Sequence, residues 1–308
     1  MASSAQDILR ILHAAGGFIP DINGTEYYVV AEESNELSEL RWFGSQLASE
    51  TFIASGIRTN SPAVYAVHDD IRSVFCVGED NALRLFMLRE DEWHEIYLSG
   101  NGNILVHPSS RLSGGVDGGG SLVFFEDFKG HIRGIRVQQD GSWRFLRSLS
   151  VDSVPGNPHF AQVQDGIAYL SYVNRDGCIH QMSMGIASRF YRDSLLSGAD
   201  FTNTHVANFI VSIDDNRVNE IRNESRSEPR DETEFCLLAL TKKDKGQEPE
   251  ELVCVDGNGK RTVLGKIVNG VFGYTSDKEN NRPVIKSAST AVSNATGGGK
   301  GGKGGKRR

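Results

Sequence analysis

The sequence predicts an all-β fold: a six-bladed β-propeller over residues 21–287, preceded by a short N-terminal helix and followed by a disordered basic tail. Two observations support this prediction. A strand–turn–strand unit recurs at intervals of about 40 to 50 residues, the spacing of propeller blades. Each unit joins two runs of β-branched and aromatic residues through an Asn or a Gly that tolerates φ > 0, as hairpin turns require. A β-sandwich with irregular hairpins is the alternative architecture.

The N-terminal extension, residues 1–20, contains the one predicted helix, over residues 5–15. Apolar residues at positions 8, 9, 11 and 12 recur with helical spacing and stop before a Gly-Gly pair. The same stretch lacks the basic and long apolar regions of a secretory signal. We therefore expect a cytoplasmic protein.

Six hairpins are expected within the propeller, because one blade cannot bury both of its faces whereas a radial array buries each sheet against the next. Their runs are 27–40, 73–86, 122–135, 169–182, 208–221 and 251–264. Their turn residues are Asn35, Asn81, Gly130, Gly177, Asn216 and Gly259. The charged stretches 222–234 and 241–251 are expected to be long loops between strands.

Composition limits the partners. Residues 288–308 repeat Gly and Lys and have too few apolar side chains to offset the entropy of ordering, which predicts a disordered tail. A formal charge of −7 does not favour a specific nucleic-acid partner or a membrane surface. No run approaches the roughly 18 apolar residues of a membrane span. The four widely spaced cysteines are expected to be buried free thiols on strands, with two distant disulfides as the alternative.

Common catalytic signatures are missing from the sequence. It contains no Walker loop, no His-Glu-x-x-His and no Gly-x-Ser-x-Gly. The eight histidines show no metal-ligand spacing, and no pair of carboxylates can be assigned to the separation that glycoside hydrolysis needs. We therefore expect no metal and no cofactor, and the sequence does not decide whether the protein is an enzyme.

The stretch "IRSVFCVGEDNALRLFMLREDEW" (71–93) resembles the repeat of the six-bladed fungal fucose-binding lectins, and the resemblance extends over residues 25–220. It implies ligand sites between neighbouring blades. In that family an Arg and a Glu bind the hydroxyls of the sugar, while a Tyr and a Trp of the adjacent blade cover its apolar face.

The resemblance does not preserve the fucose site. The family's Arg positions hold Tyr27, Ser73, Leu122, Tyr169 and Asn208, and its Glu positions hold Glu39, Leu85, Gly134, Gln181 and Glu220. Arg72 lies one residue from an Arg position, which on a strand directs it to the opposite face. Trp93 matches the family's Trp, Trp42 falls at the Tyr position, and Trp143 matches after a one-residue insertion. The candidate ligand-binding residues are Trp93, Trp42, Trp143, Glu39, Glu220 and Tyr169.

Three functions follow from these patterns. The first is a lectin-like propeller that binds a glycan or another small molecule, not fucose itself, in an inter-blade or central pocket. The second is a cofactor-free enzyme of fungal secondary metabolism, a cyclase or a hetero-Diels–Alderase-type pericyclase, because proximity alone can supply roughly 7–11 kcal/mol. The third is a scaffold whose propeller faces bind another protein. Formation of a homodimer is left open.

Overall fold

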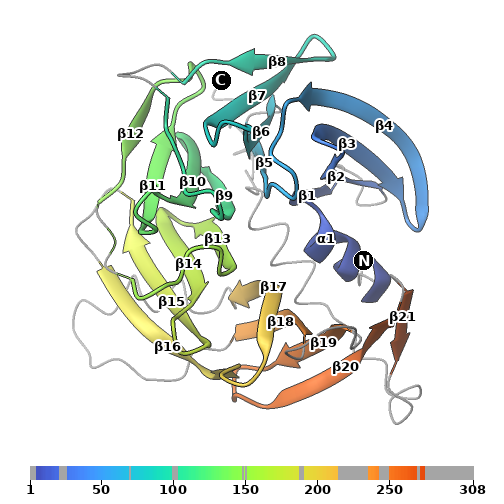
Figure 1. The fold of residues 1–308 in the computed structure, drawn as a ribbon, viewed down its shortest axis with the longest axis vertical. Coiled ribbons are helices and arrows are strands. Elements are labelled where there is room, and N and C mark those ends of the chain that lie inside the picture. Colours follow the sequence, from blue (N-terminus) through green and yellow to red (C-terminus); the bar gives the residue numbers. More distant parts are fainter. Residues whose placement is uncertain are drawn as a thin grey trace, which may run out of the picture.

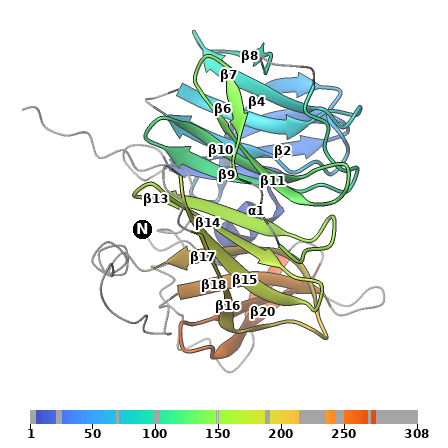
Figure 2. The ribbon, with the colours of Figure 1, turned by 90° about the vertical axis from the view of Figure 1, so that its left-hand side faces the viewer.

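The computed structural model describes residues 5–20, 26–68, 71–98, 103–147, 149, 151–186, 191–213, 235–242, 250–268 and 271–274. They form five antiparallel sheets arranged as the blades of a ring, together with one helix, α1 (Ala5–His13) (Figure 1). Figure 2 shows the same ring from the side of blades 3 and 4. The predicted all-β propeller and its N-terminal helix are therefore confirmed, but the structure has five blades and not six.

The first four blades have four strands each, ordered from the axis outward. Blade 1 contains β1 (Gly16–Pro20), β2 (Glu26–Glu33), β3 (Glu36–Phe43) and β4 (Gln46–Ser55). Blade 2 contains β5 (Val64–His68), β6 (Ile71–Val77), β7 (Leu83–Arg89) and β8 (Glu92–Ile96). Blade 3 contains β9 (Leu112–Asp117), β10 (Gly120–Glu126), β11 (Ile132–Val137) and β12 (Trp143–Phe145). Blade 4 contains β13 (His159–Gln164), β14 (Ile167–Val173), β15 (Cys178–Gly185) and β16 (Tyr191–Asp200).

Blade 5 has five strands and explains the error in the blade count. It contains β17 (His205–Ile213), β18 (Phe235–Lys242), β19 (Glu250–Val255), β20 (Arg261–Val268) and β21 (Val271–Tyr274). Strand β18 pairs with β17 on one side and with β19 on the other. The runs 208–221 and 251–264, predicted to start separate blades, thus contribute to one sheet. The boundary expected at residue 20 falls between β1 and β2 of blade 1.

The predicted hairpin turns are confirmed wherever the structure describes them. Each predicted turn residue has a positive φ, and the values are 67° for Asn35, 62° for Asn81, 82° for Gly130, 85° for Gly177 and 76° for Gly259. Asn and Gly tolerate this conformation better than other residues do, which is why the sequence could mark these five turns. Asn216 and the basic tail at 288–308 lie outside the described residues.

The hydrophobic core is divided among the interfaces between neighbouring blades, which we call seams and number by their blades. Strand β10 is buried on both faces because successive side chains point to opposite sides: Phe125 belongs to the core of seam 2/3 and Phe124 to that of seam 3/4. Separate clusters fill seam 1/2 and seam 4/5. Each sheet is thus stabilised by burial against two neighbours, as a propeller requires.

Helix α1 occupies the ring between blade 1 and blade 5 (Figure 1). Its buried residues, Ala5, Ile8, Leu9 and Leu12, follow helical spacing and pack on the leucines and isoleucines of blade 5. On its other side, Arg10 Nη1 donates a hydrogen bond to Tyr27 Oη of blade 1 at 3.0 Å. The helix therefore joins the first blade to the last, where a sixth blade was predicted.

Two further observations concern the described part of the chain. No helix in it is both long enough and apolar enough to cross a membrane. The four cysteines are free thiols, as predicted, but of the four only Cys76 is fully buried.

Candidate functional site in the axial cavity

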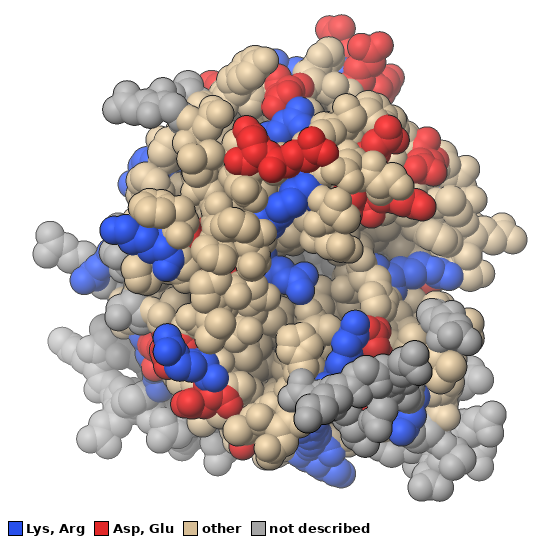
Figure 3. All heavy atoms as spheres, viewed as in Figure 1, with Lys and Arg blue, Asp and Glu red and all other residues tan. Residues whose placement is uncertain are grey.

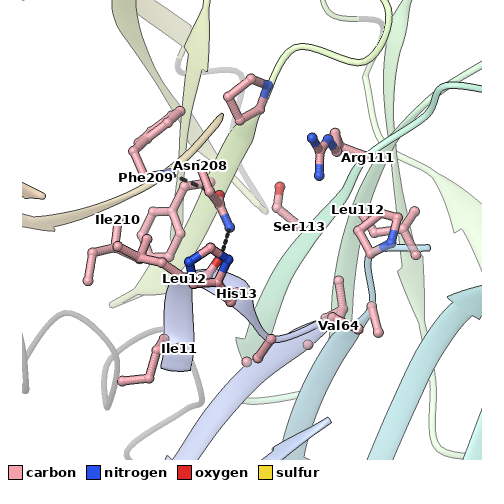
Figure 4. Close-up of a pocket in the computed structure, with 18 of the residues that line it drawn as sticks. Ile11, Leu12, His13, Val64, Arg111, Leu112, Ser113, Asn208, Phe209 and Ile210 are labelled. Atoms are coloured by element: carbon pink, nitrogen blue, oxygen red, sulfur yellow. Dashed lines mark hydrogen bonds between the residues drawn. The ribbon is translucent and has the colours of Figure 1, made fainter. Parts of the chain in front are cut away.

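A cavity of about 510 Å³ lies on the ring axis, bounded by the innermost strands and the C-terminal end of α1 (Figure 4). The face of the molecule seen in Figure 3 is hollowed near its centre, with basic side chains around the hollow. The lining draws on every blade and on the helix, and includes Leu12, Ala31, Val64, Ser113, His159 and Asn208. The cavity is thus a product of the ring as a whole.

One wall of the cavity is mainly apolar and is formed by α1 and β17. It presents Ile11, Leu12 and Ile210 (Figure 4). Asn208 Nδ2 donates a hydrogen bond of 2.8 Å to the carbonyl oxygen of Leu12. Because the last four carbonyls of a helix have no partner within the helix, this bond satisfies one of them and fixes the end of α1 against β17.

The opposite wall is polar and is formed by the start of β9. Arg111 and Ser113 are two residues apart and line the cavity (Figure 4). Leu112 between them also lines it and is at the same time part of the core of seam 2/3. Ser113 Oγ lies 2.6 Å from Nδ1 of His159 on β13. The hydrogen bond joins blades 3 and 4 at the axis and is itself buried.

Behind His159 lies a buried carboxylate, Glu126, at the end of β10. His159 Nε2 is 3.5 Å from Glu126 Oε2, and both side chains are 0% exposed. Glu126 also accepts hydrogen bonds from Ser110 Oγ at 2.8 Å, from the Arg111 amide at 2.7 Å and from the Gly156 amide at 3.1 Å. Burial alone raises the pKa of Glu126, but His159 and these donors outweigh burial and leave the pKa below its usual value.

Arg111 is half-buried in the same wall. Burial lowers the pKa of Arg111, an effect that the negative charge of Glu126 partly offsets. Across the cavity, Lys242 Nζ lies 2.6 Å from Glu250 Oε1, and His13 Nε2 lies 3.4 Å from Glu250 Oε2. Glu250, the acidic residue on that side, is therefore paired with Lys242 and His13.

Two of the predicted site residues, Glu39 and Trp93, come together away from the axis, in seam 1/2. Arg72 Nη1 donates to Glu39 Oε1 at 2.8 Å, and Tyr65 Oη donates to the same oxygen. The Trp93 ring centre is 6.4 Å from that of Tyr65. Burial raises the pKa of Tyr65, and the charge of Glu39 raises it further. Glu39 is only 6% exposed, so its carboxylate is bound by protein groups.

The other predicted site residues are dispersed. Trp42 on β3 lies beneath the guanidinium of Arg10, whose Cζ is 4.4 Å from the ring centre, so α1 covers it. Trp143 packs on the core of seam 2/3. Tyr169 is buried in β14. Glu220 lies outside the described residues. None of the three tryptophans is among the described residues that line the axial cavity.

Sequence reasoning did not identify Arg111, Ser113 or His159. The lectin resemblance directs attention to the second and third strands of each blade, whereas these residues lie at the innermost strands β9 and β13. The sequence carries little signal for them, because Arg111 and Ser113 flank Leu112 but Gly114 and Gly115 end the polar–apolar alternation after three residues. Within the described residues, no group of three or more His, Cys, Asp or Glu could hold a metal ion.

The fold places the protein among the β-propellers, and solved structures with a similar fold include lectins. The fold is similar to that of the six-bladed fungal lectin of Aleuria aurantia, with a TM-score of 0.55 and 16% identity over 82% of this chain and 78% of that one. It is also similar to the SapL1 lectin in complex with alpha methyl fucoside, with a TM-score of 0.52 and 14% identity over 87% and 84% of the two chains.

A third structure of this kind is the BP39L lectin of Burkholderia pseudomallei, with a TM-score of 0.53 and 14% identity over 85% of this chain and 72% of that one. No family model and no curated protein sequence matches the chain. The likeness is therefore one of fold, and at that level the predicted resemblance to fucose-binding lectins is confirmed.

Proposed function

We propose that the protein is a lectin-like propeller that binds a glycan or another small molecule in its axial cavity. The observation that supports this most is the pairing of a polar wall at Arg111 and Ser113 with an apolar wall at Leu12 and Ile210 in a cavity of about 510 Å³. Small-molecule sites typically measure about 300–1,000 Å³ and combine apolar surface with a few polar groups. A sugar, with its polar edge and apolar face, matches such a pair of walls.

The seams are weaker candidates than the axis in this chain. Among the lectins of similar fold, that of Aleuria aurantia recognises fucose and SapL1 forms a complex with alpha methyl fucoside. Here the corresponding polar groups are bound by other residues of the protein: Arg72 and Tyr65 bind Glu39. The ring of Trp42 is covered by Arg10. A ligand in either place would have to displace these contacts.

A matched pair of variants tests the location of the site. Ala207 lines the cavity and Ala48 is exposed on β4. Ala207→Phe should therefore narrow the cavity, while Ala48→Phe adds the same ring to the surface. After a glycan array and a metabolite library have given a ligand, titration calorimetry should show an affinity at least about tenfold weaker for Ala207→Phe only. Equal affinities for both variants and the unmodified protein would contradict the axial site.

The apolar wall also favours a second function, that of the cofactor-free enzyme. Ile11, Leu12 and Ile210 form a surface on which two apolar reactants could be held together, and orientation alone accelerates such reactions. The test is mass spectrometry of the ligand after incubation with the protein. A product with the mass of a cyclised or joined ligand supports catalysis, and recovery of the unchanged ligand supports binding alone. A gene neighbourhood with polyketide or terpene synthases would also favour the enzyme.

A further inference from the structure

Arg111 has hydrogen-bond donors that the described protein leaves unused. A guanidinium carries five N–H donors. In the described part of the chain, Arg111 makes one side-chain hydrogen bond, from Nε to the Gly156 carbonyl oxygen at 3.3 Å. Its two terminal nitrogens make none there, although the side chain is half-buried and faces the axial cavity (Figure 4). Neither terminal nitrogen is among the buried atoms that lack a partner, so both remain accessible to an anionic ligand.

A second arginine, Arg58, whose charge interacts with that of Arg111, has acceptors for both of its terminal nitrogens. Arg58 Nη1 donates to Asn81 Oδ1 at 3.2 Å and to the His107 carbonyl at 3.1 Å, and its Nη2 donates to the Ser110 carbonyl at 2.6 Å. Arg58 therefore links blades 2 and 3 by its terminal nitrogens. Arg111 joins blade 3 to the segment before blade 4 through Nε alone, and its terminal nitrogens have no such acceptors among the described residues.

No carboxylate among the described residues around the cavity forms an ion pair with Arg111, although the charge of Glu126 acts on it from a longer distance. Glu126 is bound by backbone amides, by Ser110 and by His159, as described above. Glu32 accepts hydrogen bonds from the Asn35 amide at 2.9 Å and from the Asn60 amide at 2.6 Å. Glu250 is paired with Lys242 across the cavity. The positive charge of Arg111 is thus available to a ligand.

We propose that Arg111 binds a carboxylate group of the ligand, with the Ser113 hydroxyl beside it and the remainder of the ligand against the wall formed by Leu12 and Ile210. This inference rests on the proposed axial binding site and specifies its ligand class. A planar guanidinium whose two terminal nitrogens are not bound by any described residue matches the two oxygens of a carboxylate. The same chemistry is offered by an acidic sugar and by an aromatic acid.

The experiment compares acids with their neutral analogues. Titration calorimetry is performed with D-glucuronate against D-glucose and with phenylacetate against phenylacetamide, which separates the two sources of the carboxylate. We expect one acid to bind at least about tenfold more tightly than its neutral analogue, because hydrogen bonds to charged groups are stronger than neutral ones. Arg111→Gln should remove this preference. Arg144→Gln, an exposed change of equal charge on β12, should retain it.

The variant Arg111→Lys distinguishes a change in folding from a loss of binding, because lysine keeps the positive charge but lacks the planar guanidinium. With an unchanged melting temperature, this variant should bind the acid with intermediate affinity. Three results would overturn the inference: equal affinity for acid and neutral analogue, retention of the preference in Arg111→Gln, or binding of neither acid. The proposed axial site is judged separately, because Ala207→Phe tests it with whichever ligand the screens identify.

Discussion

Ser113 on β9 and His159 on β13 meet at the ring axis, where Ser113 Oγ lies 2.6 Å from His159 Nδ1. The pair belongs to adjacent blades, and Glu126 stands 3.5 Å behind the imidazole. Because the side chains of Ser113, His159 and Glu126 are all buried, the packing of seam 3/4 sets their geometry. The polar wall of the cavity is therefore held rigidly by the same contacts that join two blades.

The buried carboxylate of Glu126 should make stability depend on pH. Its pKa in the folded protein lies below the ordinary 4.5, so folding favours the ionised form. The stability that it contributes is fully present above about pH 4.5 and is lost as the pH falls through the lower folded value. Glu126→Gln cannot ionise. We expect it to be less stable at neutral pH by about 1.5–3 kcal/mol.

Urea denaturation of both proteins at several pH values measures this effect. The difference in unfolding free energy between the native protein and Glu126→Gln should shrink as the pH falls below 4.5. A difference that stays constant across this range would show that Glu126 does not contribute through its charge.

Helix α1 should stabilise the ring as a blade would. Leu9 is 2% exposed in the interface with blade 5, so Leu9→Ala should lower the free energy of unfolding by about 2–5 kcal/mol. Leu195→Ala makes the same truncation at a side chain that is 56% exposed on β16, and should change stability by less than about 0.5 kcal/mol. Equal effects in thermal and urea unfolding would contradict the role of α1 in closing the ring.

Substitution of Trp93 distinguishes a role in packing between blades 1 and 2 from a role in ligand binding. Its ring packs on the core of seam 1/2 near Tyr65 and does not line the axial cavity. We expect Trp93→Ala to lower the melting temperature and to leave the affinity of an axial ligand within about twofold, since a difference of 1.4 kcal/mol is needed for tenfold. A tenfold loss of affinity with unchanged melting would instead assign Trp93 the ligand contact that the sequence predicts.

Fucose should bind weakly or not at all. The family's Arg positions are occupied by other residue types, and Glu39 is already bound by Arg72. Each hydrogen bond missing from a buried sugar edge costs about 1–3 kcal/mol, so two losses weaken a site by orders of magnitude. Titration calorimetry with alpha-methyl fucoside should give no micromolar site. Micromolar binding would show that a seam site persists.

The turns of this fold could be predicted because their chemistry is local. Asn35 and Gly130 adopt φ > 0 and were recognisable from the residues around them. The blade count depends on long-range pairing instead. Strand β18 follows β17 only after residues 214–234, and no local pattern shows that both belong to one sheet. The position of α1 between blades 1 and 5 depends on tertiary packing in the same way.

The candidate site was predictable only in part, for a related reason. Glu39 and Trp93 were found through their register in the repeated hairpin, and the structure does bring them together. Arg111, Ser113 and His159 gain significance only when the ring places β9 and β13 side by side at the axis. Sequence spacing gives no direct measure of this proximity, since the residues are separated by an entire blade.

The location of the ligand is tested most directly by a crystal structure of the protein with the tightest ligand from the glycan array or the metabolite library. We predict that the ligand occupies the axial cavity, with its polar group next to Arg111 and Ser113 and its apolar part against Leu12. A ligand found in seam 1/2 beside Trp93, with the axial cavity holding solvent alone, would contradict the account.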